Sequence, residues 1–481
     1  MKRLFALTAS TVALAGCTDL LFPYEKPATP TPQTFREAPD AAKNAAPNAA
    51  ANPAPVWPDK DWWKQFNSPE LTGLMEQALK NNNDLGAAVA RLKQANAEVL
   101  INGAPLLPSV ELDAGGSHTH SNRTASGTGT TSSSHNSSSY NAGLSASYEL
   151  DFWGKNYSAL LSAQASRDAS AFDLEVVRLT VTSSVATVYF DLLATDARLA
   201  NAQADLKAAQ GLLDALQLRF KQGTASALDV AQQVSLVAQQ NSALPPLILQ
   251  QSKDLDALAI LVGALPESLP RPTSKLADIA VPQVPAGLAS SLLERRPDVA
   301  EAEASLRAAH ANINEARAAF LPDITLTGQA GYASTALGSL FKPGGFLTTY
   351  GLNLVQPIFE GGLLVGGLDL TQAQYEELLQ NYHKAVLSAF ADTEDSLASV
   401  KQNAAQQTAE AEAQKAANDA YKLTQQQFDA GIVDITSVLN TERSLYGAND
   451  ALIAAKLAHL QAVAGLYKSL GGGWNTDAPQ H

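Results

Sequence analysis

The 481-residue sequence contains a single cysteine, Cys17, so an intramolecular disulfide is excluded. Aromatic residues are also scarce, at 6 %, which favours closely packed helices over a core built from large rings. The chain has no basic surplus either, because 33 Lys and Arg are set against 47 Asp and Glu. A nucleic-acid partner is therefore not expected, since no excess cations are present to neutralise phosphates. The acidic balance instead fits a soluble surface or a lumen that favours cations.

Long apolar runs are missing as well, and we expect no transmembrane helix after the N-terminus. The N-terminal apolar run, Leu4 to Ala15, follows two basic residues and is too short to span a bilayer permanently. Residues 1–16 are therefore predicted to be an export signal. The signal ends in Leu14-Ala15-Gly16-Cys17, which resembles the bacterial lipobox. We expect acyl chains on Cys17, with each buried CH₂ contributing about 0.8 kcal/mol to membrane binding.

The residue after the cysteine bears on membrane sorting. In lipoproteins of this kind, an Asp directly after the Cys tends to retain the protein in the inner membrane. Here Thr18 occupies that place and Asp19 follows, so the resemblance implies sorting to the outer membrane. Residues 17–61 are predicted to be an anchor and an extended tether, because Pro and Ala dominate the stretch. The alternative is an export signal with an incidental cysteine. Apart from the covalent lipid, no cofactor is expected.

Four short stretches alternate apolar and polar residues. They are Ser109–Gly115, Tyr140–Leu150, Asp323–Tyr332 and, less regularly, Tyr350–Val355. Alternation over about ten residues with Tyr near the ends is typical of transmembrane β-strands, and half-buried strands of a soluble sandwich are the alternative. The Ser-, Thr- and Gly-rich stretch Ser117–Ser139 is predicted to be a flexible loop.

Four strands are too few to close a membrane barrel, since the smallest ones use about eight. An open strand edge in hydrocarbon leaves backbone N–H and C=O groups unpaired, at a cost of several kcal/mol each. Two interpretations remain: the strands are not in a membrane, or several chains share one barrel.

Long helices are the other prominent feature. Two Pro-free stretches repeat apolar residues about every 3.5 positions, the period of a left-handed coiled coil, over Lys155–Gln222 and Gly362–Ala430. At 1.5 Å per residue, each helix is on the order of 100 Å long. A tight glycine turn then leads to a shorter helix, Leu228–Val262 or Asp434–Leu470. Two further helices that lead into strands are predicted at Leu85–Gly103 and Asp298–Ala319.

The two halves of the chain match each other at a nearly constant offset. Ala104–Pro108 aligns with Ala318–Pro322, and Phe220–Gly223 aligns with Phe428–Gly431. Matches in the same order predict duplication of a helix–strand–strand–helix–helix unit. We assign the first repeat to residues 62–270 and the second, with the C-terminal tail, to residues 271–481.

Several motifs together resemble the TolC-like outer-membrane efflux family, most closely its lipoprotein branch of OprM/NodT-like outer-membrane factors. The residues that carry the resemblance are Glu294-Arg295-Arg296-Pro297-Asp298-Val299, Ala302-Glu303, Phe320-Leu321-Pro322, Asn82, Asp84, Leu85 and the two Phe-x-x-Gly hairpins. The resemblance implies an α+β membrane protein: a homotrimer with a 12-stranded β-barrel, four strands from each chain, continued by a coiled-coil α-helical barrel in the periplasm.

The function implied by the resemblance is the passive exit duct of a tripartite efflux pump for small toxic compounds. Its partners would be a periplasmic membrane-fusion adaptor, an inner-membrane transporter of the RND type and outer-membrane lipid. Two alternatives stay open, namely a structural coiled-coil lipoprotein that does not conduct and a duct of the same fold for type I protein secretion. No constellation of nucleophile, base and orienting residue indicates an enzyme.

In the resembled family, the helical hairpins form the closed periplasmic tip that meets the adaptor. The resemblance places Gly223 and Gly431 at this tip, and Asp229 at the position of an aperture acid. Asn440 falls where many relatives carry another carboxylate, and Arg443, three residues on, could reach Asp229 or Glu442 on a neighbouring helix. A reversing helix favours positive φ, so both glycines also have a plain structural explanation.

Other polar groups have structural interpretations that we prefer. Pro297 and Asp298 begin a helix, and the two preceding arginines fix a connection. His118, His120 and His135 lie in the predicted flexible loop without carboxylate or thiol partners, so no metal site is expected.

The uncharged Asn440 predicts an aperture less acidic than in relatives with two carboxylates, and therefore weaker block by multivalent cations. Phe428 adds to this expectation, because it lacks the hydroxyl of the Tyr found in some relatives. Conductance in planar bilayers, with and without a trivalent cation, would measure the block. Strong block that survives Asp229→Ala would contradict the assignment of Asp229.

Overall fold

The computed structural model describes residues 22–29, 35–36, 59–123, 133–283 and 296–474. The fold consists of two compact units. Unit 1 comprises residues 1–27, 92–170 and 302–382, and unit 2 comprises residues 28–91, 171–301 and 383–481. Each predicted repeat therefore contributes to both units. Cys17 and the export signal lie outside the described residues.

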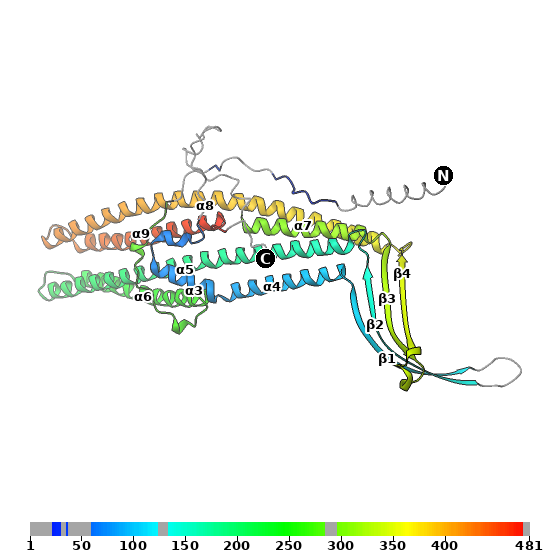
Figure 1. The fold of residues 1–481 in the computed structure, drawn as a ribbon. Coiled ribbons are helices and arrows are strands. Elements are labelled where there is room, and N and C mark those ends of the chain that lie inside the picture. The colour runs from blue at the N-terminus through cyan, green and yellow to red at the C-terminus, as the bar shows by residue number, and fades with distance from the viewer. Residues whose placement is uncertain (1–21, 30–34, 37–58, 124–132, 284–295, 475–481) are drawn as a thin grey trace. The chain divides into compact units, whose positions relative to one another are not determined.

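Unit 1 contains one antiparallel sheet, in the order β1-β2-β3-β4 (Figure 1). The strands are β1 (Ser109–Arg123), β2 (Ser133–Glu149), β3 (Asp323–Ser334) and β4 (Phe346–Val355). All four predicted strands are therefore present. Because β1 and β4 are the outer strands, each is paired along one edge only within the described chain.

The register places the apolar residues of all four strands on one face. Leu112 pairs with Leu144, Leu144 pairs with Ala330, and Leu326 pairs with Leu352. Residues paired directly across antiparallel strands point to the same side, so these side chains form one continuous apolar face. That face is bare: Leu112 is 78 % exposed and Leu352 is 68 % exposed. The opposite face carries polar side chains such as those of Glu111, Ser145 and Gln329.

The predicted flexible loop at Ser117–Ser139 is wrong for most of its length. Residues Ser117 to Arg123 continue β1 and pair with Ser139 to Ser133 of β2, so a two-stranded ribbon runs past the ends of β3 and β4 (Figure 1). Inter-strand hydrogen bonds hold this ribbon without any need for apolar side chains, which is why composition did not indicate it.

The long helices agree closely with their predicted bounds. They are α5 (Lys155–Lys221) and α8 (Leu363–Asp429), each of 67 residues, followed by α6 (Ala227–Leu261) and α9 (Ile435–Ser469), each of 35 residues. The equal lengths agree with an internal repeat, which stays a prediction. One 18-residue window of α5 is apolar enough to cross a membrane by length and composition, contrary to our expectation. Half of that window is buried inside the structure.

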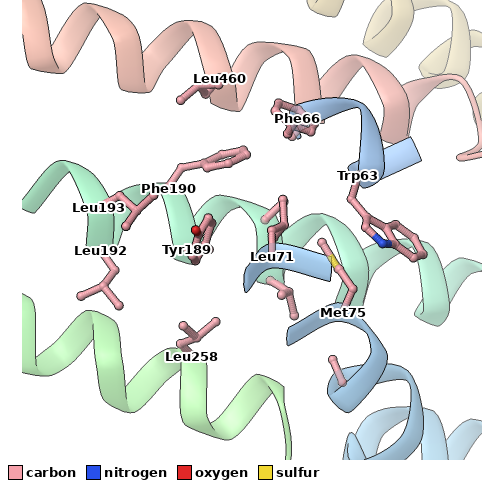
Figure 2. Packing of buried hydrophobic residues seen from close by; sticks show 14 of the residues in the cluster. Trp63, Phe66, Leu71, Met75, Tyr189, Phe190, Leu192, Leu193, Leu258 and Leu460 are labelled. Carbon is pink, nitrogen blue, oxygen red and sulfur yellow. The ribbon is translucent and has the colours of Figure 1, made fainter. Parts of the chain in front are cut away.

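The core of unit 2 contains more aromatic rings than the composition suggested. A short 3₁₀ helix, η1 (Trp62–Phe66), inserts its rings against α5 and α9. Trp62 stacks on Tyr467 at 5.1 Å between ring centroids, and Phe66 packs on Phe190 at 5.0 Å. Figure 2 shows Phe66 and Phe190 near each other, and Leu460 of α9 together with Leu71 and Met75 of α3 (Pro69–Asn81) belongs to the same cluster. The few aromatic residues are thus concentrated where helices of unit 2 meet.

Asn82, one of the family-like residues, joins three segments of unit 2. Its side-chain oxygen accepts hydrogen bonds from the main-chain N–H groups of Asp84 (2.9 Å) and Leu85 (3.1 Å), which begin α4 (Asn83–Gly103). Its amide donates to the main-chain oxygen of Leu261 at the end of α6, at 2.9 Å. The side chain is therefore a cap for one helix and a clamp on another.

Arg296 has the same kind of role at the start of α7 (Pro297–Ala318). Its guanidinium donates to the carboxylate of Asp298 at 3.0 and 2.7 Å and to Asp392 of α8 at 3.1 Å. It also donates to the main-chain oxygen of Ser469 at the end of α9, at 3.0 Å. The structural interpretation of this arginine and of Pro297 as the first helical residue is confirmed. Arg295 lies outside the described residues.

Arg296→Ala should lower the free energy of unfolding by about 2–3 kcal/mol, because it leaves buried acceptors without a donor. Denaturant unfolding of the purified protein would measure the loss. Arg198→Ala is the matched control, since Arg198 also bonds one Asp, Asp450, through two nitrogens, but both side chains are more than 40 % exposed. It should cost less than about 1 kcal/mol. Equal losses for the two variants would contradict the role of burial at Arg296.

Candidate functional site

The candidate site is the pair of helical hairpins in unit 2, α5–α6 and α8–α9. Gly223 ends the first long helix with φ of +76°, and Gly431 ends the second with φ of +73°. At the first turn, the Gly223 N–H donates to the main-chain oxygen of Phe220 at 2.9 Å. The Thr224 N–H donates to the main-chain oxygen of Arg219, also at 2.9 Å. This is a Schellman motif, which satisfies the last carbonyl groups of a helix. The expectation of positive φ at both glycines is confirmed.

The second turn repeats this pattern of hydrogen bonds. Gly431 N–H donates to the main-chain oxygen of Phe428 at 3.0 Å, and Ile432 N–H donates to that of Gln427 at 2.8 Å. Both hairpins therefore reverse by the same backbone geometry, which only glycine adopts without strain at the φ > 0 position.

The returning helices α6 and α9 begin with side-chain caps. Asp229 forms a capping box with Ser226: Asp229 N–H donates to the Ser226 hydroxyl at 3.1 Å, and Ser226 N–H donates to the Asp229 carboxylate at 2.8 Å. In the second hairpin, Asp434 accepts from the N–H of Ser437 at 2.9 Å. The hydrogen bonds that the N–H and the hydroxyl of Ser437 donate to Asp434 hold the pKa of Asp434 below its ordinary value. Asp229 is therefore a helix cap in this structure, and its predicted aperture role stays a prediction.

A small apolar cluster holds the two hairpins together. Its buried members come from three helices: Leu216 of α5, Leu236 of α6, and Ile435, Val438 and Leu439 of α9. Helix α8 adds Tyr421 and Phe428 at the margin. Because every helix of both hairpins contributes, moving one hairpin relative to the other would expose this cluster to water.

Arg219 makes a polar contact between the ends of the two long helices. Its guanidinium lies 4.6 Å from the ring centroid of Phe428, and Nη2 is 3.4 Å from the carboxylate of Asp429. A cation over an aromatic face is attracted by the ring, by about 0.5–1 kcal/mol at an exposed site. Phe428 lacks a hydroxyl but thus still contributes to the contact between hairpins. The sequence carried no signal for this pairing.

The remaining predicted aperture residues lie on the surface of α9. Asn440 and Arg443 are both exposed, and within the described residues no ion pair joins Arg443 to Asp229. Glu442, the residue directly before Arg443, is fully buried. Burial raises the pKa of Glu442, while the Tyr446 hydrogen bond and the Arg443 charge oppose that shift. The sequence pattern gave no sign that Glu442, a predicted partner of Arg443, is buried.

Two histidines that were predicted to lie in a flexible loop lie instead on a strand. His118 and His120 lie on β1, with ring nitrogens hydrogen-bonded across the ribbon to Ser138 (2.9 Å) and Asn136. No cluster of three or more metal-binding side chains occurs among the residues whose placement is described.

Gly223→Ala should destabilise the protein by about 1–2 kcal/mol, because a Cβ is unfavourable at positive φ. No atom lies within 4 Å of the added Cβ, so the cost is one of backbone conformation alone. Gly211→Ala is the matched control: Gly211 lies inside α5, also with open space around it, and alanine there should stabilise by about 0.5–1 kcal/mol. Thermal unfolding would compare the two, and changes of the same sign would contradict the turn geometry.

Comparison with known proteins agrees with this architecture. The outer membrane efflux protein family matches residues 74–264 and 288–472. The pyoverdine export outer membrane protein OpmQ of Pseudomonas putida KT2440 is 41 % identical over 457 residues, which are 94 % of this chain and 95 % of that protein. OpmQ of Pseudomonas aeruginosa PAO1 is 42 % identical over 420 residues, 87 % of this chain and 88 % of that one. The open-state MtrE outer membrane channel of Neisseria gonorrhoeae has a TM-score of 0.82 and 29 % identity, covering 94 % of this chain and 98 % of that one. The chain belongs to the outer membrane efflux protein family.

Proposed function

We propose that this chain forms, as a homotrimer, the outer-membrane exit duct of a tripartite efflux pump. The observation that carries the proposal is the sheet of unit 1: its apolar face is bare, and within the described residues its two outer strands have no partner along their outer edges. All ten residues of β4 are exposed, on both faces. In water such a sheet would be unstable and prone to aggregate. In a bilayer, an apolar face toward lipid and a polar face toward a lumen are both favourable.

The trimer follows from the same edges. Three chains supply twelve strands, which is enough to close a membrane barrel, whereas four strands are not. Pairing β1 of one chain with β4 of the next would satisfy the backbone groups that each chain leaves open. Twelve is also the number that the family resemblance implies.

The N-terminal segment supports a lipid anchor on Cys17. Within unit 1, residues 22–26 run antiparallel to α7. The Phe22 main-chain oxygen accepts from Asn314 at 3.0 Å, the Phe22 ring lies under Arg317, and Lys26 pairs with Glu303 at 2.8 Å. Phe22 therefore lies near the C-terminal end of α7, which leads into β3. Phe22 follows Cys17 by five residues, and five extended residues span at most about 17 Å. A lipid anchor within that reach of the base of the sheet suits a barrel in the same membrane.

The hairpins are the proposed periplasmic aperture and adaptor contact, with Gly223, Asp229, Gly431, Asn440 and Arg443 at or near it. The exposed residues Asn440 and Arg443 are available to a neighbouring chain or to the adaptor. Two relatives are named for pyoverdine export. We therefore propose pyoverdine as the first cargo to test, with an inner-membrane transporter of the RND type as the partner that selects it.

Protein purified from outer membranes should migrate as a trimer on unheated gels and as a monomer after heating. In planar bilayers it should show single-channel conductance, since a closed barrel encloses a polar lumen. The mass of the chain should show cleavage before Cys17 and added acyl chains. A membrane-inserted monomer, or a trimer without conductance, would contradict the duct and favour a structural lipoprotein.

Cargo is tested separately, by supplying the gene to Pseudomonas putida that lacks OpmQ and measuring pyoverdine in the medium. Restored export would support the cargo. Conductance without restored export would reject pyoverdine but leave the duct intact.

A further inference from the structure

Two acidic residues, the buried Glu442 and the partly buried Asp205, lie where the two hairpins meet and are not among the proposed aperture residues. Glu442 of α9 is completely inaccessible to solvent. One of its carboxylate oxygens accepts a hydrogen bond from the Tyr446 hydroxyl, which also lies 3.2 Å from the main-chain oxygen of Asp205 on α5. The other carboxylate oxygen, Oε2, is buried without a hydrogen-bond partner. A buried ionised carboxylate with an unsatisfied oxygen is strongly unfavourable.

The second acid is Asp205 itself. Burial raises the pKa of Asp205 to about 6, and the charge of Glu442 adds to the shift. Burial also raises the pKa of Glu442, while the Tyr446 hydrogen bond and the Arg443 charge oppose that shift. Tyr446 connects the two residues, because its hydroxyl meets the Glu442 carboxylate and the main-chain oxygen of Asp205. A negative charge on Glu442 therefore makes ionisation of Asp205 less favourable.

The surroundings of the pair offer little compensation. On α8, burial raises the pKa of Tyr421, and Glu442 raises it further, so this phenol stays neutral. Burial and the Glu442 hydrogen bond likewise keep Tyr446 protonated. On α6, the buried Gln233 donates to the main-chain oxygen of Ala209 at 2.7 Å. Arg443 is the one cation acting on Glu442 among the described residues, and it is solvent-exposed.

The position of the pair connects it to the packing of both hairpins. Val438 and Leu439 belong to the apolar cluster between the hairpins, and Glu442 follows on the same face of α9 one turn later. Tyr446 continues that face by one more turn. The interface between the hairpins therefore has the apolar cluster at one end and the acidic pair at the other.

We propose that Asp205 and Glu442 form a proton-operated latch: a protonated pair holds the two hairpins together, and loss of the proton loosens the contact between α5 and α9. The charge change is local, but it acts on an interface to which all four helices contribute. If the hairpins form the aperture, as proposed above, a rise in periplasmic pH favours opening and a fall favours closure.

The direction of the pH dependence follows from the raised pKa values. Below about pH 4 the acids are protonated whether or not the contact is formed, so pH has little effect there. As pH rises through about 6, the two carboxyl groups lose their protons. The closed contact then holds negative charges that water would solvate better. The contact is thus strongest in acid and weakens from about pH 4 to above pH 6.

Glu442→Gln removes the charge and keeps the length of the side chain and an oxygen for Tyr446. Hydrogen–deuterium exchange of the intact trimer, divided by the intrinsic rate at each pH, would report opening of α9 near residues 438–446. At pH 7.5 we expect exchange in the variant to be slower than in wild type by roughly tenfold, the factor that one pKa unit represents. At pH 5 the difference should be smaller, because the acids then keep more of their protons in the closed contact. Asp205→Asn should behave in the same way from the α5 side.

Glu412→Gln is the matched control, because Glu412 is an exposed carboxylate on α8. It removes one charge and should leave exchange in α9 unchanged at both pH values. Equal exchange in wild type and Glu442→Gln at pH 7.5 would overturn the latch, as would a difference of the same size at pH 5 and pH 7.5, which would indicate packing alone. The exchange measurement does not depend on conduction, so it separates failure of the latch from failure of the proposed duct. In bilayers, the rise in open probability from pH 5 to pH 7.5 should be lost in Glu442→Gln.

Discussion

Backbone hydrogen bonding at the edges of the sheet is the constraint on which the rest of the molecule depends. A four-stranded sheet with an apolar face has two open edges, and each unpaired N–H or C=O in hydrocarbon costs several kcal/mol. Neither β1 nor β4 finds a second partner strand within the described chain. The chain is thus incomplete by itself, and its neighbours in the proposed trimer must supply the missing pairs. Stable insertion into the membrane therefore depends on assembly of the trimer.

The helices are held by a small number of specific polar and aromatic contacts. Trp62 and Phe66 concentrate ring contacts in unit 2. Asn82 and Arg296 each tie a helix start to the end of another helix. Asn82 and Arg296 each satisfy main-chain groups that a helix leaves unpaired at its end. This explains why they belong to the family-like motifs although neither touches the hairpin turns.

The interface between the hairpins is different, because it leaves a buried polar group without a partner. Its apolar cluster is small, and it is followed by the buried Glu442, the partly buried Asp205 and the Arg219 contact with Phe428. Local conflicts of this kind weaken an interface and tend to occur where function requires movement. If the hairpins form the proposed aperture, a weak contact between them would suit opening and closing, whereas the proposal makes no such demand of the core around Trp62.

The sequence by itself determined the features that are local in the chain. Coiled-coil periodicity placed α5 and α8 within one residue of their observed ends, two-residue alternation located all four strands, and turn chemistry indicated positive φ at Gly223 and Gly431. Tertiary structure decided what depends on pairing between distant segments. The ribbon through Ser117 is held by inter-strand hydrogen bonds that polar composition does not reveal, and the burial of Glu442 depends on how α9 is set against α5. Periodicity describes one element at a time, so it could not show which two elements meet at a given residue.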